Sequence, residues 1–337
     1  MAKRLIDELR DFLNDSQGKE VTLSYLRNEL RVDPSTPAWN GIRVAMLRLV
    51  EEKVVRASGR NDGTYKVVKQ VTPVRIFGKE RRKPIELIFP RDFHTMEEMS
   101  FAKSLVIREG NLILLSGVSN LGKTLLALSF CAENLDSNPV LMGNEYTTID
   151  GEPDQRFLSR LDRMDWVEWC NGDGTERFTL LPVREDYAEH IIKDRINIID
   201  WINLENHYEI SPVMEGIKKE IGRGVGVIAI QKSEASDAGR GGQFTRDFAD
   251  VELILDKLGN HEVLLRIGKV KESTEQVMGR TFAYGIHKGV KIVDFREVMK
   301  CNQCWGKGWK KSGNSSMPCD NCRKTGYVDK PLKDMIG

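Results

Sequence analysis

A glycine-rich stretch of the chain reads Gly117-Val118-Ser119-Asn120-Leu121-Gly122-Lys123-Thr124 and has the form G-x4-G-K-[ST]. Its glycines allow the backbone to curl, so that successive N–H groups point at phosphate oxygens. The lysine of this motif reaches the β- and γ-phosphates of a nucleoside triphosphate, and the threonine hydroxyl holds Mg²⁺. The stretch therefore predicts a phosphate-binding loop with ATP and Mg²⁺ as its ligands.

The residues on either side of this loop suit a strand and a helix. Residues 111–116 form a short apolar run of the kind found in buried parallel strands, and residues 125–133 read as an apolar helix. A helix that starts at the loop adds its dipole to the anion site. Further apolar runs follow at 139–143, 195–200, 224–230, 251–255 and 262–267. Helical segments separate the earlier runs from one another. This alternation predicts an α/β fold with a parallel sheet.

Polar residues follow three of these predicted strands. Glu145 lies just beyond the second strand, Asp200 ends the third and Gln231 follows the fourth. In an open α/β sheet, functional groups gather at the carboxyl ends of the strands. A carboxylate at position 200 would hold Mg²⁺ together with Thr124.

The order of these residues, followed by Lys269 and Lys271, resembles the RecA-like ATPases over residues 98–298, and within them the DnaB-type ring helicases. The resemblance implies that Glu145 polarises the attacking water and that Gln231 senses the γ-phosphate. It also implies that Lys269 and Lys271 reach the nucleotide of a neighbouring subunit, in a homo-oligomer such as a hexamer.

Two features depart from that family. Its second basic finger is usually arginine, whereas this chain has Lys271, which lacks the bidentate guanidinium fork. Residues 147–184 are polar, aromatic and rich in loop-forming residues, so that the helix expected in this segment is not predicted.

Residues 1–69 predict three helices, over 2–13, 22–30 and from 36 onward, and then a hairpin with strands at 53–58 and 64–68. This order resembles a winged helix-turn-helix domain, in which the third helix enters the major groove and the wing contacts the backbone. A domain of this kind also binds proteins in some cases. The resemblance implies five DNA contacts: Asn40, Arg43, Arg48, Arg56 and Arg60.

Residues 70–97 are predicted to form a basic, proline-containing linker, and residues 299–337 a zinc module. The module has two C-x2-C pairs, Cys301 with Cys304 and Cys319 with Cys322, whose four thiolates suit one tetrahedral Zn²⁺. The first pair continues as C-x-x-C-x-G-x-G and resembles the cysteine-rich modules of DnaJ-type chaperones. The second pair has Lys324 where that pattern has its first glycine. The basic and aromatic residues of the zinc module suit either nucleic acid or a protein partner.

Length and charge agree with this division. The 337 residues allow two or three domains, and 40% of them are hydrophobic. Residues 1–69 carry 13 basic and 10 acidic side chains, residues 300–337 carry 8 and 3, and the middle carries 30 and 37. Basic ends on an acidic centre suggest contact with nucleic acid through the ends.

The sequence contains no run of eighteen apolar residues and no apolar secretory core near Met1. We therefore expect no membrane partner, reduced cysteines and a location in the cytoplasm of a bacterial or phage-infected cell.

The leading hypothesis is a DNA-acting, RecA-like ATPase that works as a ring or filament, as a helicase, translocase or remodelling factor in replication or recombination, with protein partners from those processes. Two alternatives stay open. One is an ATP-gated, sequence-specific DNA-binding switch that recognises an origin or regulates transposition. The other is a scaffold in which the flanking modules bind proteins.

Overall fold

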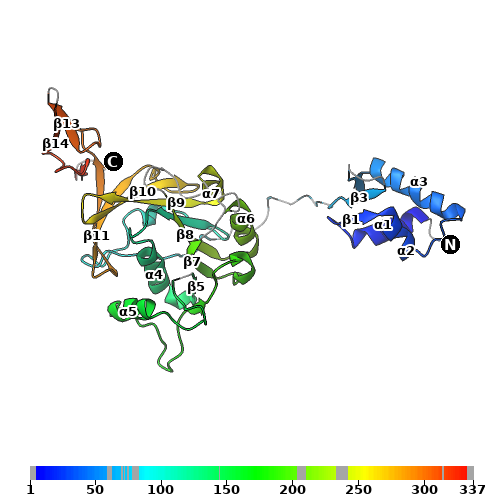
Figure 1. Cartoon of the computed structure of the whole chain (residues 1–337), viewed down its shortest axis with the longest axis horizontal. Helices are drawn as coiled ribbons and strands as arrows, with labels where there is room; N and C mark the ends of the chain where they lie inside the picture. Colours follow the sequence, from blue (N-terminus) through cyan, green and yellow to red (C-terminus); the bar gives the residue numbers. More distant parts are fainter. Residues whose placement is uncertain are drawn as a thin grey trace. The chain divides into compact units, whose positions relative to one another are not determined.

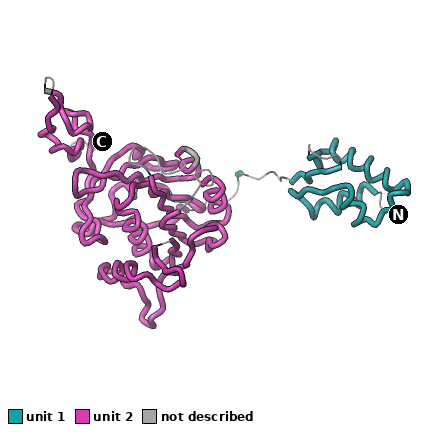
Figure 2. Tube along the Cα trace, in the orientation of Figure 1, with its two compact units in different colours: residues 1–81 teal, residues 82–337 magenta. Residues whose placement is uncertain are grey.

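The computed structural model describes residues 5–58, 63–69, 71, 73, 76–77, 83–143, 145–202, 210–232, 242–312 and 315–331. The chain divides into two compact units, Met1–Arg81 and Arg82–Gly337 (Figure 2). Each has its own hydrophobic core. No helix among the described residues is long and apolar enough to cross a membrane.

Among its described residues, the first unit contains three helices and a three-stranded sheet of order β1-β3-β2 (Figure 1). The three predicted helices and the two strands of the hairpin are present. The short strand β1 was not predicted, because three residues with one buried side chain carry too little periodicity. The elements are α1 Leu5–Asn14, β1 Glu20–Thr22, α2 Leu23–Glu29, α3 Pro37–Glu51, β2 Val55–Ala57 and β3 Thr64–Val67.

Helix α3 buries one side and exposes the other. Ile42, Met46 and Leu49 are fully buried in the core of the first unit. The remaining face of the helix is exposed and carries three of the predicted DNA contacts, and a fourth is exposed on β2. The exposed candidates are Asn40, Arg43, Arg48 and Arg56, whereas Arg60 lies outside the described residues.

A ten-stranded sheet organises the second unit, in the order β15-β12-β11-β10-β9-β4-β8-β7-β5-β6. The strands from β9 to β6 pair in parallel, and those from β9 to β15 pair antiparallel. The predicted α/β class is therefore confirmed. The strands are β4 Leu112–Gly117, β5 Val140–Met142, β6 Thr179–Leu181, β7 Ile196–Ile202, β8 Val225–Gln231, β9 Val251–Leu258, β10 Glu262–Val270, β11 Thr281–His287, β12 Lys291–Lys300 and β15 Tyr327–Asp329. A separate hairpin consists of β13 Trp309–Ser312 and β14 Ser315–Pro318.

Helices cover both faces of this sheet. Because strand residues alternate between faces, Ile113 and Leu115 of β4 pack in the core that includes α4, whereas Leu112 and Leu114 pack in the core that includes α6. The two faces thereby fix β4, and with it the loop at its end. The helical segments are α4 Lys123–Glu133, α5 Gln155–Arg163, α6 Ile210–Glu220 and α7 Gln243–Phe248, with short 3-10 turns at Ala102–Ser104, Leu135–Ser137 and Tyr187–His190.

The prediction for residues 147–184 was wrong, because this segment contains helix α5 and the edge strand β6. Helix α5 begins after Asp154, whose carboxylate accepts a hydrogen bond from the Arg156 N–H at 2.7 Å. Phe157 is the only fully buried residue of this nine-residue helix. A short, charged helix with one buried residue lacks the apolar period on which sequence prediction depends.

The second half of the predicted linker, 70–97, belongs to the second unit. Phe89 is buried in the main core, and its ring contacts those of Phe101 and Phe130 at centroid distances of 5.8 and 5.0 Å. Burial of such a side chain is incompatible with a free linker. The proline residues of this stretch favoured the prediction of a linker, whereas its second half is a packed, extended segment.

Candidate nucleotide site and metal centre

The phosphate-binding loop joins the end of β4 to the start of α4. Gly122 adopts φ +80°, and a Cβ atom there would lie 2.9 Å from Ile286 Cδ1, so the position requires glycine. The Lys123 ammonium group donates hydrogen bonds to the carbonyls of Gly117 at 3.0 Å and Val118 at 2.8 Å. Burial lowers the pKa of this lysine. The lysine of the loop is therefore hydrogen-bonded to two backbone carbonyls of the loop itself.

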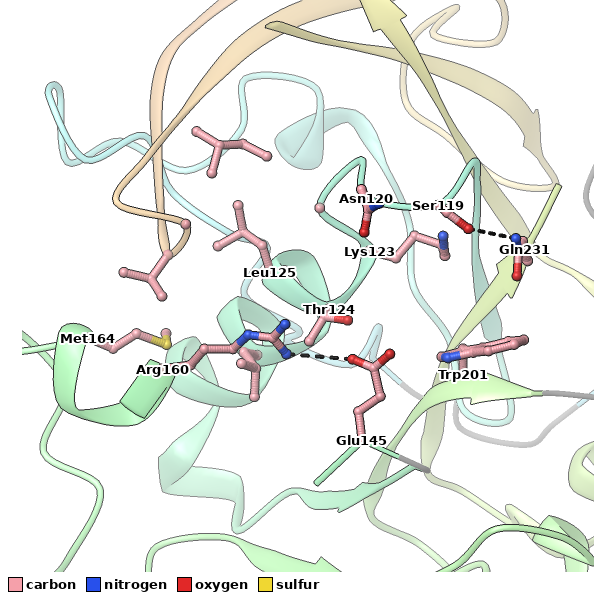
Figure 3. Close-up of a pocket in the computed structure, with 15 residues that line it drawn as sticks. Ser119, Asn120, Lys123, Thr124, Leu125, Glu145, Arg160, Met164, Trp201 and Gln231 are labelled. Carbon is pink, nitrogen blue, oxygen red and sulfur yellow. Dashed lines mark hydrogen bonds and ion pairs between the residues drawn. The ribbon is translucent and has the colours of Figure 1, made fainter. Parts of the chain in front are cut away.

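Three neighbouring strands bring polar residues to the same edge of the sheet, and Figure 3 shows two of these residues, Glu145 and Gln231, beside the loop. Gln231 at the end of β8 pairs with Gly117, Asp200 lies on β7, and Glu145 follows β5. Gln231 and Glu145 line a cavity of about 340 Å³ together with the loop, and β7 contributes Trp201, the neighbour of Asp200, to its lining. Its lining includes Ser119, Asn120, Lys123, Thr124, Glu145, Arg160, Met164, Trp201, Gln231, Ile286 and Val290.

Asp200 is completely buried and has one unused oxygen. Its Oδ2 accepts a hydrogen bond from the Tyr146 hydroxyl at 2.7 Å, whereas Oδ1 has no hydrogen-bond partner of good geometry among the described residues. Burial raises the pKa of this carboxyl, and the Tyr146 and Thr124 hydroxyls oppose that rise. A buried oxygen without a partner, close to the Thr124 hydroxyl, fits the oxygen ligands that Mg²⁺ requires.

Glu145 and Gln231 each contact a polar side chain at the margin of the cavity. The Glu145 carboxylate is half exposed and lies 3.8 Å from the Arg160 guanidinium. The Gln231 amide donates a hydrogen bond to the Ser119 hydroxyl within the loop at 2.6 Å. Both side chains line the cavity beside the loop.

Lys269 and Lys271 lie away from this cavity. In the sheet, Lys269 pairs with Glu252, and Glu252 pairs with Leu114. Leu114 precedes Gly117 by three residues, so these lysines lie about 10 Å or more along the strands from the loop. The structure therefore does not bring them to the phosphate loop of their own chain.

Both lysines have partners within their own chain. The Lys269 ammonium donates to the carbonyls of Arg246 at 2.6 Å and Asp247 at 3.2 Å. Lys271 forms an ion pair of 2.7 Å with Asp250, which also pairs with Lys218 at 2.5 Å. Hydrogen bonds from the two lysines outweigh the effect of burial and lower the pKa of Asp250.

Sequence analysis missed Tyr146, which contacts the buried Asp200, and several residues that line the cavity. Tyr146 directly follows Glu145, and a tyrosine next to a candidate catalytic acid was the only available signal. Arg160 lies in α5, which was not predicted. Ile286 and Val290 come from the ends of β11 and the turn to β12, more than 150 residues from the loop in sequence. No local pattern links such distant residues to the phosphate site.

Replacing Asp200 with asparagine is expected to stabilise the ligand-free protein while abolishing Mg²⁺-dependent hydrolysis. The substitution removes a buried charge whose Oδ1 lacks a partner, and it keeps an acceptor for Tyr146. We expect the melting temperature in EDTA to rise on the order of 2–4 °C. A lower melting temperature for the Asp200→Asn protein would contradict this account of the site.

The four predicted zinc ligands lie together at the end of β12. Their sulfur atoms all lie within 4.8 Å of one another and are buried. The Sγ atoms of Cys301 and Cys319 are 3.8 Å apart, and those of Cys304 and Cys322 are 3.6 Å apart. Tetrahedral Zn²⁺ with bonds of about 2.3 Å requires sulfur separations of about 3.8 Å.

Backbone and amide N–H groups point at these sulfurs. Gly308 N–H donates to Cys304 Sγ at 3.2 Å, Gly326 N–H donates to Cys322 Sγ at 3.3 Å, and the Asn321 amide donates to Cys301 Sγ at 3.2 Å. The Asn321 hydrogen bond is the main cause that lowers the pKa of Cys301 to about 6. Donors aimed at sulfur favour thiolates, so this donor set fits one zinc ion.

No protein-family model and no curated protein matches this sequence. A comparison of structures finds a KaiC-like protein from the hyperthermophilic archaeon Pyrococcus horikoshii OT3, with 16% sequence identity and a TM-score of 0.43. The match covers 63% of this chain and 98% of that protein. The assignment of the site rests on its own geometry.

Proposed function

We propose that this chain is a RecA-like ATPase that acts on DNA as a ring or filament, as a helicase, translocase or remodelling factor. The observation that carries the ATPase proposal is that Lys123 and Glu145 line one cavity, while Asp200 is buried on β7 directly before the lining residue Trp201. A site for binding alone would need the loop but no buried metal-ligating carboxylate and no nearby base.

Each residue has a defined part in hydrolysis. Lys123 releases the loop carbonyls and binds the β- and γ-phosphates of ATP. Thr124 and Asp200 would hold Mg²⁺, which would supply positive charge to neutralise the phosphates. Glu145 leaves Arg160 and orients the attacking water, and Gln231 reports the γ-phosphate to the loop through its contact with Ser119.

The position of Lys269 and Lys271 supports a site shared between subunits. Neither lysine can reach a nucleotide bound to the phosphate loop of its own chain without disrupting β10. Lys269 lies on that strand and Lys271 directly follows it. In a head-to-tail ring, however, each subunit joins one of its surfaces to a different surface of the next, so a residue distant from its own loop can contact the loop of a neighbour. We propose that the pair contacts the γ-phosphate of the neighbouring subunit.

The first unit supplies the DNA contact in this proposal. Arg43 and Arg48 are exposed on the same helix as Val44 and Leu47, and Arg56 is exposed on β2. The arginines suit phosphates and guanine edges, and exposed apolar side chains suit thymine methyl groups. This combination also supports the second candidate, an ATP-gated switch that reads a specific duplex sequence.

One experiment tests the role of DNA. We expect duplex and forked DNA to stimulate ATP hydrolysis by the full chain, and the Arg43→Ala/Arg48→Ala variant to lose most of that stimulation at unchanged basal rate. The slope of log affinity against log salt should fall by about two, since two phosphate contacts are removed. A matched control is Lys103→Ala, an exposed lysine of the second unit.

The same assay separates the two candidates. Strand separation of a forked duplex by an ATP-dependent oligomer supports the helicase, whereas tight binding of one duplex sequence without strand separation supports the switch. If DNA of any form leaves the rate of hydrolysis unchanged, and the chain does not bind DNA at low salt, the DNA-acting role is wrong.

A further inference from the structure

The zinc module displays two large aromatic side chains that no core explains. Trp305 is 79% exposed and Trp309 is 48% exposed. Trp305 directly follows Cys304 at the tip of the first cysteine pair, and Trp309 begins β13. Exposed tryptophans on a small module indicate a surface that binds a partner.

The two cysteine pairs have the same backbone and differ in the side chains at their tips. The Cys301 N–H donates to the Gly326 carbonyl and the Cys319 N–H donates to the Gly308 carbonyl, both at 2.8 Å. A Cβ atom on either glycine would collide with the opposite segment. The two halves are therefore related by an approximate twofold axis, and equivalent positions can be compared.

This comparison singles out Lys324. In the first half, Trp305 and Gly306 adopt φ +56° and +82°, and in the second half, Arg323 and Lys324 adopt φ +48° and +71°. Lysine thus occupies a left-handed position that glycine fills in the equivalent place, which costs free energy for a residue with a Cβ atom. Strain of this kind persists where the side chain serves a purpose.

The Lys324 side chain lies against one of the exposed tryptophans. Its ammonium group is 5.5 Å from the centroid of the Trp309 ring. The strained position therefore places a positive charge directly beside an aromatic face. A cation next to a flat ring is what a nucleotide needs, since its phosphate and its base are bound together.

The rest of the module adds to this charge. Residues 300–331 contain seven lysines and arginines and two aspartates. Asp329 is already paired with Arg296 of β12. Among the described residues, no carboxylate forms an ion pair with any of four exposed side chains of the module: Lys307, Lys311, Arg323 and Lys324.

We propose that the zinc module binds single-stranded nucleic acid, with bases stacked on Trp305 and Trp309 and phosphates held by Lys324, Arg323 and neighbouring lysines. Unpaired bases are required, because a duplex hides the base faces on which tryptophan stacks. The positive charge argues against a basic or neutral protein segment as the occupant. The proposal rests on the proposed function, since it names the polymer that a DNA-acting ATPase would hold on this surface.

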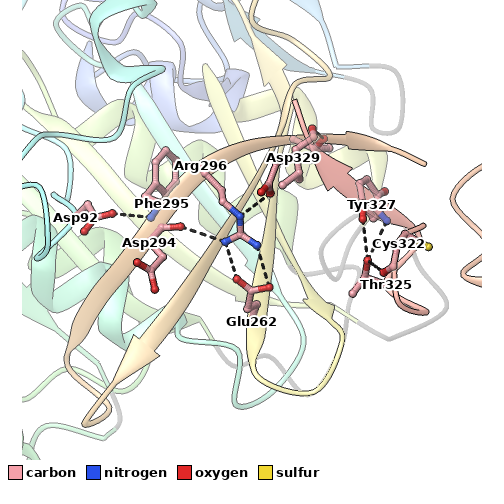
Figure 4. A network of polar contacts seen from close by, with 11 residues as sticks. Asp92, Glu262, Asp294, Phe295, Arg296, Cys322, Thr325, Tyr327 and Asp329 are labelled. Carbon is pink, nitrogen blue, oxygen red and sulfur yellow. Dashed lines mark hydrogen bonds and ion pairs between the residues drawn. The ribbon is translucent and has the colours of Figure 1, made fainter. Parts of the chain in front are cut away.

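The zinc module is joined to the sheet that carries the nucleotide site. This connection links nucleic acid bound to the module with the site of ATP hydrolysis. Strand β15 pairs with β12, and Arg296 of β12 bonds Asp329 at 2.7 Å and Glu262 of β10 at 2.6 Å (Figure 4). A single strand of nucleic acid held on the zinc module would therefore be attached to the same sheet that carries the nucleotide site.

The test uses the full chain and fluorescein-labelled oligo(dT), oligo(U) and a blunt duplex. We expect Trp305→Ala/Trp309→Ala to weaken binding of a single strand by about tenfold or more. Lys324→Gly restores glycine at the strained position, so we expect it to fold at least as well but to bind several-fold more weakly. Lys103→Ala is the matched control and should bind unchanged.

Bound zinc and the basal rate of ATP hydrolysis are measured for every variant, and both should stay at the level of the unaltered protein. These readouts separate this proposal from the proposed function, which fails instead if hydrolysis itself is absent. Unchanged single-strand affinity of Lys324→Gly and of the double tryptophan variant would overturn the proposal. So would an equal loss of duplex binding, or capture of an acidic protein segment with no affinity for either oligonucleotide. The ratio between oligo(dT) and oligo(U) identifies the polymer.

Discussion

Hydrolysis of ATP by the Lys123→Ala protein is expected to be slower than that of the unaltered protein by about a hundredfold to a thousandfold. The lysine is the one ammonium group of the phosphate loop, and it is already held at the loop by two backbone carbonyls. Its removal leaves the developing charge on the transferred phosphoryl group without this partner. Steady-state release of phosphate at saturating ATP measures the effect.

A mixing experiment extends this prediction to the shared site. In a ring, a Lys123→Ala subunit still offers Lys269 and Lys271 to its neighbour, and a Lys271→Ala subunit still offers an intact loop. An equimolar mixture of the two inactive proteins should therefore regain activity at about a quarter of its interfaces. If the mixture stays as inactive as its components while the subunits exchange, the lysines do not act between subunits.

Loss of zinc is the second large effect that the structure predicts. The full chain should contain about one zinc per chain, bound by four sulfur ligands, and Cys319→Ala should remove it. Metal binding to such sites is worth on the order of 10–16 kcal/mol, which here supports a module with few buried residues besides its cysteines. We expect the Cys319→Ala module to unfold and become sensitive to proteolysis after residue 300.

The matched control is Cys170→Ser, since Cys170 is exposed and lies outside the cluster. It should keep its full zinc content and resist proteolysis. Retention of one zinc by the Cys319→Ala protein would contradict the four-sulfur site, as would its loss from the Cys170→Ser protein. X-ray absorption at the zinc edge would report the number of sulfur ligands directly.

The sequence predicted the parts of this molecule that depend on local patterns. The motif around Lys123 required a strand before it and a helix after it, and both are present. The positions of Asp200 and Gln231 followed from the rule that functional groups gather at one edge of a parallel sheet, although β7 continues two residues beyond Asp200, to Ile202. The cysteine spacing was sufficient to predict that four sulfurs would meet.

What could not be predicted depends on packing between distant segments. Tyr146 contacts Asp200 only because β5 and β7 are neighbours, and Gly143 permits this approach, since a Cβ there would strike the Asp200 carbonyl. Phe89 is buried by partners from other segments, and its own neighbourhood suggested a linker. Helix α5 is stabilised by its N-cap residue, Asp154, and by the buried ring of Phe157. One buried residue does not produce the apolar periodicity by which a helix is predicted from sequence.

Strand β15 has a consequence for solubility. An unpaired strand at the margin of a sheet is a template for association with another chain. Here the last long strand, β12, is covered over Val298, Met299 and Lys300 by the three residues of β15, which emerges directly from the second cysteine pair. A zinc ion held by the four cysteines would therefore also protect this margin of the sheet, and its removal would expose β12 and make the chain prone to aggregate.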